Sequence, residues 1–204
     1  MQQLNSVEWR RLLRLFVAGA EEMRPLLKSP FEQNGYVCAT NTHALIRVSK
    51  RFITDDYSTD KRLPDVASVM PEHNPISAIT IDTLRGEFVR QNIDYDTTTT
   101  DCPECDEECE VEWEYTDSDG DKYKMWAECP CCGGTGVIPN GINKKCQVIG
   151  ATISVHYMLL IYHVMVALGI GKVEITRGKR EQLLFHIAEG VDVVVMPCSN
   201  SKTL

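Results

Sequence analysis

Residues 151–198, ATISVHYMLLIYHVMVALGIGKVEITRGKREQLLFHIAEGVDVVVMPC, decide the fold that we predict for this chain. The segment contains one densely apolar helix, for which Ser154 is a suitable N-cap and Gly169 or Gly171 a suitable stop. A strand that begins at Cys146 leads into this helix, and the β-branched runs after it predict three more strands, separated by the turns GKRE and EGVD. The predicted order is strand, helix, strand, strand, strand, at 146–154, 154–169, 172–178, 182–190 and 192–198.

The sequence before residue 99 gives a weaker version of the same order. It offers a helix with Ser6 as N-cap, a hairpin of two short strands, and then a strand followed by a helix with Asp82 as its cap. The polar stretch after the hairpin contains Pro64 and Pro71 and predicts a connection. We therefore expect an α+β domain of two strand-helix-strand-strand-strand halves. The N-terminal elements are expected at 6–19, 36–40, 43–49 and 76–92, with the connection at 51–75.

The composition is that of an ordinary globular protein. Hydrophobic residues make up 43% and charged residues 25% of the chain. No apolar run approaches the roughly 20 residues that a membrane-spanning helix needs. The N-terminal stretch has neither the apolar block nor the small-residue cleavage site of a secretory signal. These features predict a cytoplasmic protein.

The nine cysteines favour a metal site over disulfides, because their number is odd and six of them lie between Cys102 and Cys132. The spacing of Cys102 with Cys105, and of Cys129 with Cys132, lets two tight turns aim four thiolates at one ion. An all-cysteine set predicts structural Zn2+, since catalytic zinc usually has His or carboxylate ligands and an open position. Cys109 or Cys131 remains an alternative for the fourth ligand.

Between the two cysteine pairs the residues alternate, turn at DSDGD and return, which predicts a hairpin. A calcium loop is the alternative interpretation of DSDGD, but the sequence lacks the later bidentate acid. The negative charge is concentrated here: 12 acidic and two basic residues lie between Asp101 and Glu128, so this segment carries −10 in a chain of net charge −8. The remaining residues carry 17 acidic and 19 basic side chains, so the charge does not exclude a surface that faces DNA. We divide the chain into an N-terminal half, a zinc-binding insert and a C-terminal half, at 1–98, 99–138 and 139–204.

The second cysteine pair continues as CPCCGGTG, with Cys129, Cys132, Gly134 and Gly136 in CxxCxGxG spacing. This short motif resembles the cysteine-rich repeats of DnaJ-type chaperones. The resemblance supports the metal rather than chaperone activity, because the sequence has no J-domain signature.

The two flanks resemble bacterial sliding clamps, the DNA polymerase III beta subunit. Residues 35–48, GYVCATNTHALIRV, are similar to that family's strand, T-D-G-H-R-L turn and following strand, and Leu63–Pro71 is similar to its FPDY…LP connection. The C-terminal half matches four further features of the family in order. These are the YLL…AL helix at 157–160 and 167–168, the VEL strand at 173–175, the acidic turn at 188–190 and the final strand ending in MP at 193–197. A complete clamp subunit has three such domains, so the resemblance implies that a ring would need several copies of this chain.

In clamps a hydrophobic pocket formed by the T-D-G-H-R-L turn and the last strand receives linear peptides from polymerases and other clients. Thr42 replaces the family's glycine and Ala44 its arginine. The resemblance implies a peptide-binding set of Thr40, Thr42, His43, Leu45, Val194 and Met196.

Clamp helices line the DNA hole and contact phosphates through Lys and Arg. Arg10, Arg11 and Arg14 on the first helix are the candidates for DNA-facing residues, and a solvated helix face is the alternative. The later helix offers only His156 and His163. We expect the histidines to be structural, and Cys38, Cys146 and Cys198 to be buried thiols.

The leading hypothesis is a non-catalytic DNA sliding clamp-like protein or replication accessory factor of a phage or mobile element. Its partners would be encircled double-stranded DNA, further copies of itself, and polymerase or other replication proteins bound through a linear peptide. One alternative is a phage or mobile-element interaction module that binds a protein through the acidic zinc hairpin or the peptide pocket. Another is a chaperone-like or redox module with Cys109 and Cys131 as free thiols. No catalytic constellation or phosphate-binding loop is present in the sequence, so we do not expect an enzyme.

Overall fold

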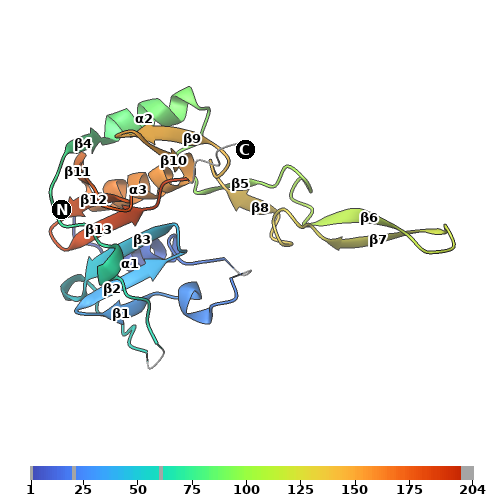
Figure 1. Cartoon of the computed structure of the whole chain (residues 1–204), viewed down its shortest axis with the longest axis horizontal. Coiled ribbons are helices and arrows are strands. Elements are labelled where there is room, and N and C mark those ends of the chain that lie inside the picture. Colours follow the sequence, from blue (N-terminus) through green and yellow to red (C-terminus); the bar gives the residue numbers. More distant parts are fainter. Residues whose placement is uncertain (1, 20–21, 60–61, 199–204) are drawn as a thin grey trace.

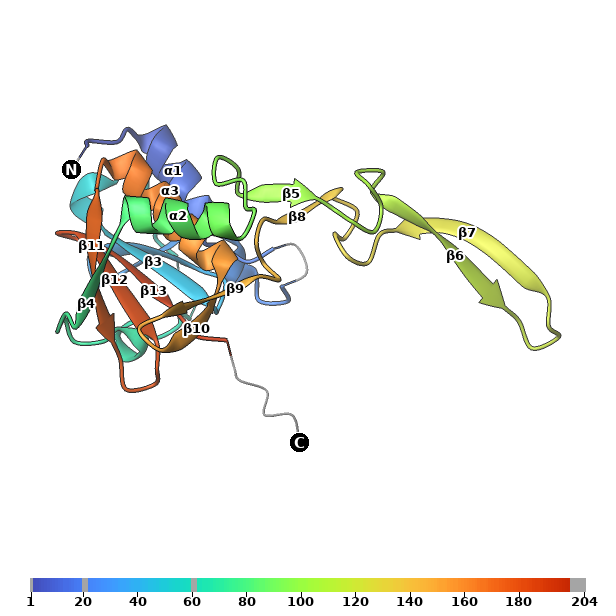
Figure 2. The ribbon, with the colours of Figure 1, turned by 90° about the horizontal axis from the view of Figure 1, so that it is seen from above.

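The computed structural model describes residues 2–19, 22–59 and 62–198. Its body is a seven-stranded antiparallel sheet in the order β1-β2-β3-β13-β12-β11-β4, with the helices α1, α3 and α2 side by side on one face (Figures 1 and 2). A slender arm, residues 99–139, projects from this body. The elements of the body are α1 (Ser6–Arg14), β1 (Phe31–Gln33), β2 (Tyr36–Thr40), β3 (Ala44–Ser49), β4 (Ser77–Thr80), α2 (Ile81–Arg90), β9 (Lys145–Val148), β10 (Ala151–Ser154), α3 (Val155–Leu168), β11 (Lys172–Arg177), β12 (Leu183–Ala188) and β13 (Val191–Val195).

The two halves of the chain meet in the middle of the sheet, where β3 pairs with β13. The register runs from Ala44 opposite Val195 to Val48 opposite Val191. All of β13 is buried, because helices cover one face of the sheet and the connection after β3 covers part of the other. A strand buried on both faces favours the nearly continuous valine run found there.

The central helix, α3, is apolar on nearly every side, and α1, α2 and the sheet bury most of it, although Val166 is 46% exposed. Ser154 caps its start by accepting the N–H of His156 at 3.3 Å, and Gly169 ends it in the left-handed conformation (φ 65°). The predicted helix at 154–169 is therefore confirmed. Within the described ranges no helix is both long and apolar enough to cross a membrane.

The starts of the other two helices differ from the prediction. Asn5, not Ser6, caps α1, because its side chain accepts the N–H of Val7 and Glu8 while the Glu8 carboxylate accepts the N–H of Asn5. This helix ends at Arg14, well before residue 19. The cap of α2 is Thr80 rather than Asp82, since Thr80 has the extended backbone that a cap needs and Asp82 already lies in the first turn.

The strands also differ in two places. The single strand predicted at 146–154 is wrong: β9 and β10 form a hairpin whose turn residues, Ile149 and Gly150, both have positive φ. The N-terminal half has no strand before α1 among the residues described from Gln2 onward, and it has a strand, β1, that was not predicted. The order of the N-terminal half is therefore α1, β1, β2, β3, β4 and α2, which does not repeat the order of the C-terminal half.

The arm is built from two successive antiparallel pairs. The stem pairs β5 (Thr99–Asp101) with β8 (Val137–Pro139), and the ribbon pairs β6 (Glu110–Thr116) with β7 (Lys122–Glu128). The DSDGD residues form the hairpin turn at the tip, where the Asp117 side chain accepts the N–H of Asp119 and Asp121. The predicted hairpin is therefore confirmed.

Candidate functional site

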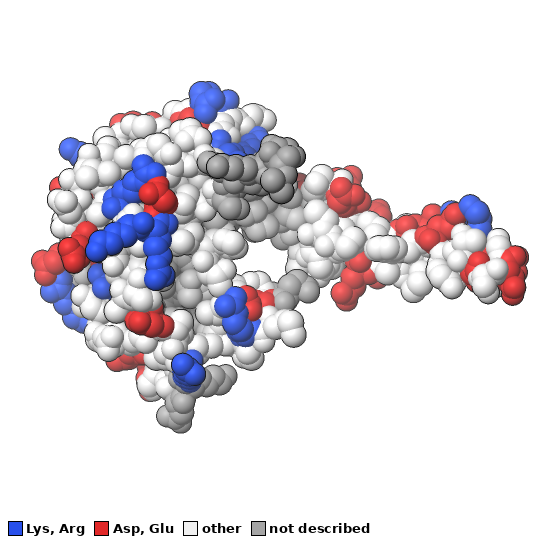
Figure 3. Space-filling model, viewed as in Figure 1, with Lys and Arg blue, Asp and Glu red and all other residues white. Residues whose placement is uncertain are grey.

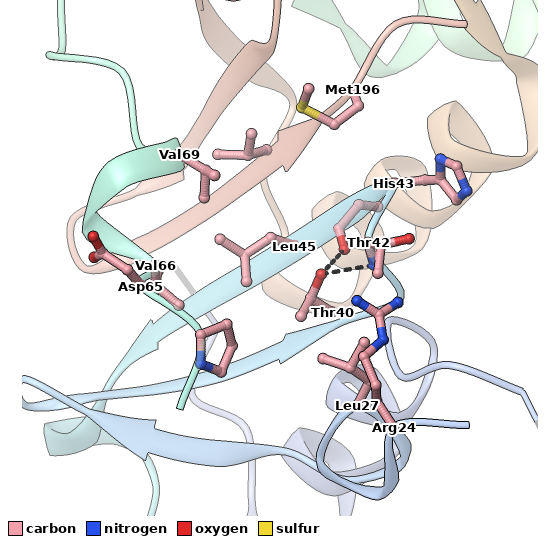
Figure 4. A pocket seen from close by; sticks show the side chains of 13 residues that line it. Arg24, Leu27, Thr40, Thr42, His43, Leu45, Asp65, Val66, Val69 and Met196 are labelled. Carbon is pink, nitrogen blue, oxygen red and sulfur yellow. Dashed lines mark hydrogen bonds between the residues drawn. The ribbon is translucent and has the colours of Figure 1, made fainter. Parts of the chain in front are cut away.

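A small cavity of about 180 Å³ opens where the β2–β3 turn meets the end of β13 (Figure 4). All six residues of the predicted peptide-binding set line it, although they come from opposite ends of the chain. The sequence did not predict that the following residues also line the cavity: Arg24, Leu27, Ala44, Pro64, Asp65, Val66 and Val69.

Apolar side chains form the floor and one wall of the cavity. Leu45 and Val194 lie directly opposite each other in the β3–β13 register, and both are almost fully buried. Val66 and Val69 come from the connection after β3 and face Leu45 across the cavity, while Met196 lies on the far side (Figure 4). In the sequence, the spacing of Val66 and Val69 within LPDVASVMP could have indicated that both side chains face the same side. A floor of this kind can accept an apolar side chain of a ligand.

The β2–β3 turn is held by side-chain hydrogen bonds. Thr40 Oγ1 donates to the carbonyl of Ala44 at 2.8 Å and accepts the N–H of Thr42 at 3.0 Å. Asn41 Oδ1 accepts the N–H of His43 at 3.1 Å and of Ala44 at 2.9 Å. These hydrogen bonds fix the conformation of the β2–β3 turn, which supplies several of the residues that line the cavity.

A further hydrogen bond joins this turn to the residue that follows β13, because the N–H of Met196 donates to the carbonyl of His43 at 2.7 Å. The His43 ring also stacks with Tyr157 of α3, with centroids 6.3 Å apart. The turn, the last strand and the central helix are thereby locked together at the mouth of the cavity.

Thr42 occupies a left-handed backbone conformation, with φ at 78°. Such a conformation suits glycine, the residue of the clamp motif at this position, and costs a β-branched residue on the order of 1–3 kcal/mol. The hydrogen bonds of Thr40 and Asn41 hold the turn in this form. Thr42 therefore adds a side chain at the cavity rim.

The rim of the cavity carries charges of both signs. Arg24 lies near the turn, and Asp65 lies beside Val66 in the connection (Figure 4). The guanidinium of Arg24 is paired with Glu22 at 2.8 Å, and this hydrogen-bonded pairing lowers the pKa of Glu22 to about 2. Polar groups at the edge of an apolar floor can orient a bound chain.

The second candidate site is the cysteine cluster at the junction of stem and ribbon. The Sγ atoms of Cys102 and Cys129 are 3.8 Å apart, those of Cys105 and Cys132 are 3.7 Å apart, and all four lie within 4.8 Å of one another. A tetrahedral site with metal–sulfur bonds of about 2.3 Å has sulfurs roughly 3.8 Å apart. The four thiols therefore fit one metal ion, and the described residues bring neither Cys109 nor Cys131 into this set.

Two similar turns position the four sulfurs. The N–H of Asp106 donates to the carbonyl of Cys102 at 2.9 Å, and the N–H of Gly133 donates to the carbonyl of Cys129 at 2.8 Å. Gly136, a residue of the DnaJ-like motif, has φ at 74° and donates its N–H to Cys132 Sγ at 3.3 Å. A Cβ atom on Gly136 would lie 3.0 Å from the carbonyl oxygen of Glu107, so glycine is needed there.

The thiols of the cluster differ in pKa. Burial raises the pKa of Cys105 to about 12. At Cys132 burial also opposes ionisation, but hydrogen bonds from the Gly136 N–H and the neighbouring thiols outweigh it and lower the pKa to about 6. A bound cation would favour the thiolate form of all four.

The three arginines predicted to face DNA are not brought together. Arg10 and Arg14, one helical turn apart, line a surface hollow with Lys28 and Tyr57, and Arg10 pairs with Asp55 at 2.8 Å. Arg11 lies on another side of α1, beside α3 and residues 96–99. A DNA-facing role for these residues stays a prediction.

The histidines of α3 do not add positive charge to this layer. His156 is buried, and its Nδ1 lies 3.1 Å from the carbonyl of Asn140. Burial lowers the pKa of His156 and of His163, so both are neutral at pH 7. Burial likewise raises the pKa of Cys38 to about 12 and of Cys146 to about 11, which makes them poorly reactive.

No protein-family model matches the sequence, and no curated protein matches it. Solved structures of bacterial sliding clamps match the fold. DNA polymerase III subunit beta from Borrelia burgdorferi gives a TM-score of 0.52 at 13% identity, over 96% of this chain and 62% of that chain. The sliding clamp from Pseudomonas aeruginosa gives 0.48 at 15% identity, over 93% and 64%. The clamp from Caulobacter crescentus gives 0.48 at 14% identity, over 96% and 64%.

The likeness to the Borrelia burgdorferi protein lies in the fold, since only 13% of the aligned residues are identical. The chain spans 62% of the length of that clamp subunit. This structural match, together with the large antiparallel sheet and its single layer of helices, shows that the chain has a sliding clamp-like fold.

Proposed function

We propose that this chain is a non-catalytic, clamp-like replication protein that binds linear peptides of other replication proteins. The observation that supports the proposal most strongly is the cavity at the β3–β13 seam, where the six motif residues from both ends of the chain meet. The clamp-like fold supports the same function independently of those residues.

The shape of the cavity limits the peptide. A volume of about 180 Å³ takes one large or two small apolar side chains, not a folded domain. An anchor of this kind would contact Leu45, Val194 and the two valines of the connection, while Arg24 and Asp65 would contact polar groups of the peptide. Such a partner is a short segment with apolar anchors.

The cysteine cluster would hold a structural Zn2+ ion through Cys102, Cys105, Cys129 and Cys132. Four sulfur ligands leave no open position for substrate, so the ion would stabilise the arm rather than catalyse a reaction. The two-stranded stem and ribbon are too small to be stable without such a crosslink.

DNA encirclement is the further part of the proposal. Helices cover one face of the sheet, and that layer would face the DNA, with Arg10, Arg11 and Arg14 near the phosphates. Because the chain spans only part of a clamp subunit, a ring would need several copies. The outer edge of β4, a terminal strand of the sheet with exposed residues, offers one surface for pairing between copies.

Met196→Ala combined with Val69→Ala should weaken binding of a labelled peptide from a clamp-binding polymerase by about tenfold or more. Each substitution removes apolar contact at the cavity, and about 1.4 kcal/mol corresponds to a factor of ten. Fluorescence anisotropy measures the affinity, and Val166→Ala, an exposed apolar substitution on α3, is the control. Peptide binding that is unchanged by the double substitution, or absent in the unmodified protein, would contradict the pocket assignment.

Cys105→Ser should abolish the bound zinc, whereas Cys131→Ser should retain about one ion per chain, because only the former removes a ligand of the tetrahedral set. Elemental analysis of the purified proteins gives the stoichiometry. The free energy of unfolding of the body should change little in either variant, since the arm packs as a separate unit. Loss of zinc in Cys131→Ser would show that this residue is a ligand.

Native mass spectrometry should give a multiple of the 23.0 kDa chain mass. The assembled protein should stay on circular duplex DNA at high salt and leave it after linearisation, because topological linkage does not depend on phosphate contacts. A persistent monomer at micromolar concentration, or retention that salt abolishes equally on both DNA forms, would rule out encirclement.

A further inference from the structure

The ribbon of the arm has two chemically different faces. In the antiparallel register Val111 lies opposite Ala127, Trp113 opposite Met125 and Tyr115 opposite Tyr123. Directly opposed side chains lie on the same face of a sheet. Successive side chains along each strand point to opposite faces. One face of the ribbon is therefore entirely apolar or aromatic, and we call these six residues the aromatic face.

Most of the aromatic face is open to solvent. Val111 packs against the cysteine cluster, but Trp113, Tyr115, Tyr123 and Met125 are 48%, 62%, 55% and 59% exposed. The described residues place no second layer on this side of the ribbon, which projects away from the body (Figures 1 and 2). A contiguous exposed aromatic surface of this kind marks an interaction site.

The opposite face and the tip carry the acidic charge. Glu110, Glu112, Glu114 and Glu128 lie on that face with two lysines, and both lysines are already used, since Lys122 pairs with Glu114 at 2.6 Å and Lys124 with Glu112 at 2.9 Å. Acidic side chains are visible along the arm and at its tip (Figure 3). Nucleic acid and anionic membranes are therefore poor partners.

Charge also disfavours a second arm as the occupant. Between Asp101 and Glu128 each copy carries 12 acidic and two basic residues, so two stacked ribbons would repel each other. A cationic protein segment gains from the same carboxylates, and its Lys or Arg groups can also lie over the Trp and Tyr rings.

We infer that the aromatic face binds a basic protein segment in which apolar residues are flanked by Lys or Arg. The apolar residues of the partner would cover Trp113 and Met125, and its cations would reach the acidic edges and tip of the ribbon. The site is separate from the peptide cavity of the body and does not depend on the proposed clamp function.

The test uses the full chain loaded with zinc and three labelled twelve-residue peptides of alternating Lys and Leu, Lys and Ser, or Glu and Leu. The Lys-Leu peptide should bind at least ten times more tightly than the other two. Trp113→Ser with Met125→Ser should weaken its binding tenfold or more. Trp126→Ser is the matched control, because Trp126 is 62% exposed on the opposite face. Its effect should stay below threefold.

Equal binding of the Lys-Ser peptide would reduce the site to non-specific charge and overturn the inference. An effect of Trp126→Ser as large as that of the double substitution would overturn it as well. So would sedimentation showing self-association that the double substitution abolishes, since a second copy would then be the occupant. Zinc content of the variants verifies that the arm is intact.

Discussion

The antiparallel pairing of β3 with β13 is the interaction on which the rest of the structure depends. It joins the N-terminal and C-terminal halves into one sheet and places Leu45 directly opposite Val194. The same pairing brings the His43 carbonyl to the Met196 N–H, so the turn and the final strand form the cavity together. Without this register Leu45 and Val194 would not meet in the floor of the candidate peptide site.

The arm can be accommodated between these halves because its two ends are paired with each other. Thr99 lies opposite Pro139 at the base of the stem, so the chain leaves and re-enters the body at one place. Beyond the stem, the cysteine cluster brings residues of both strands of the arm within 4.8 Å of one another. This arrangement places the excess of acidic residues in the arm, away from the body. It also places the exposed aromatic face at a distance from the cavity.

The sequence allowed the dense helix, the three final strands and the cysteine set to be predicted because each has a strong local signal. The apolar run of α3, the CxxC spacing and the valines of β13 do not depend on distant contacts. The Ile149–Gly150 turn was missed because residues on both sides of it alternate, although the buried positions change phase there, from Cys146 and Val148 to Ala151 and Ile153. The Asn5 cap was missed because Ser6 offers a similar side chain. Arg24 and Asp65 could not be assigned to the cavity, since only the tertiary fold brings them to its rim.

Under the proposed function, client peptides bind at the seam where β3 pairs with β13. Hydrogen–deuterium exchange of the full chain, with and without a polymerase-derived peptide, tests this binding site. Slower exchange should appear at residues 42–45, 66–69 and at Met196, with no change in β6 or β7. Protection confined to the arm, or unchanged exchange at the seam while the peptide is bound, would contradict the claim.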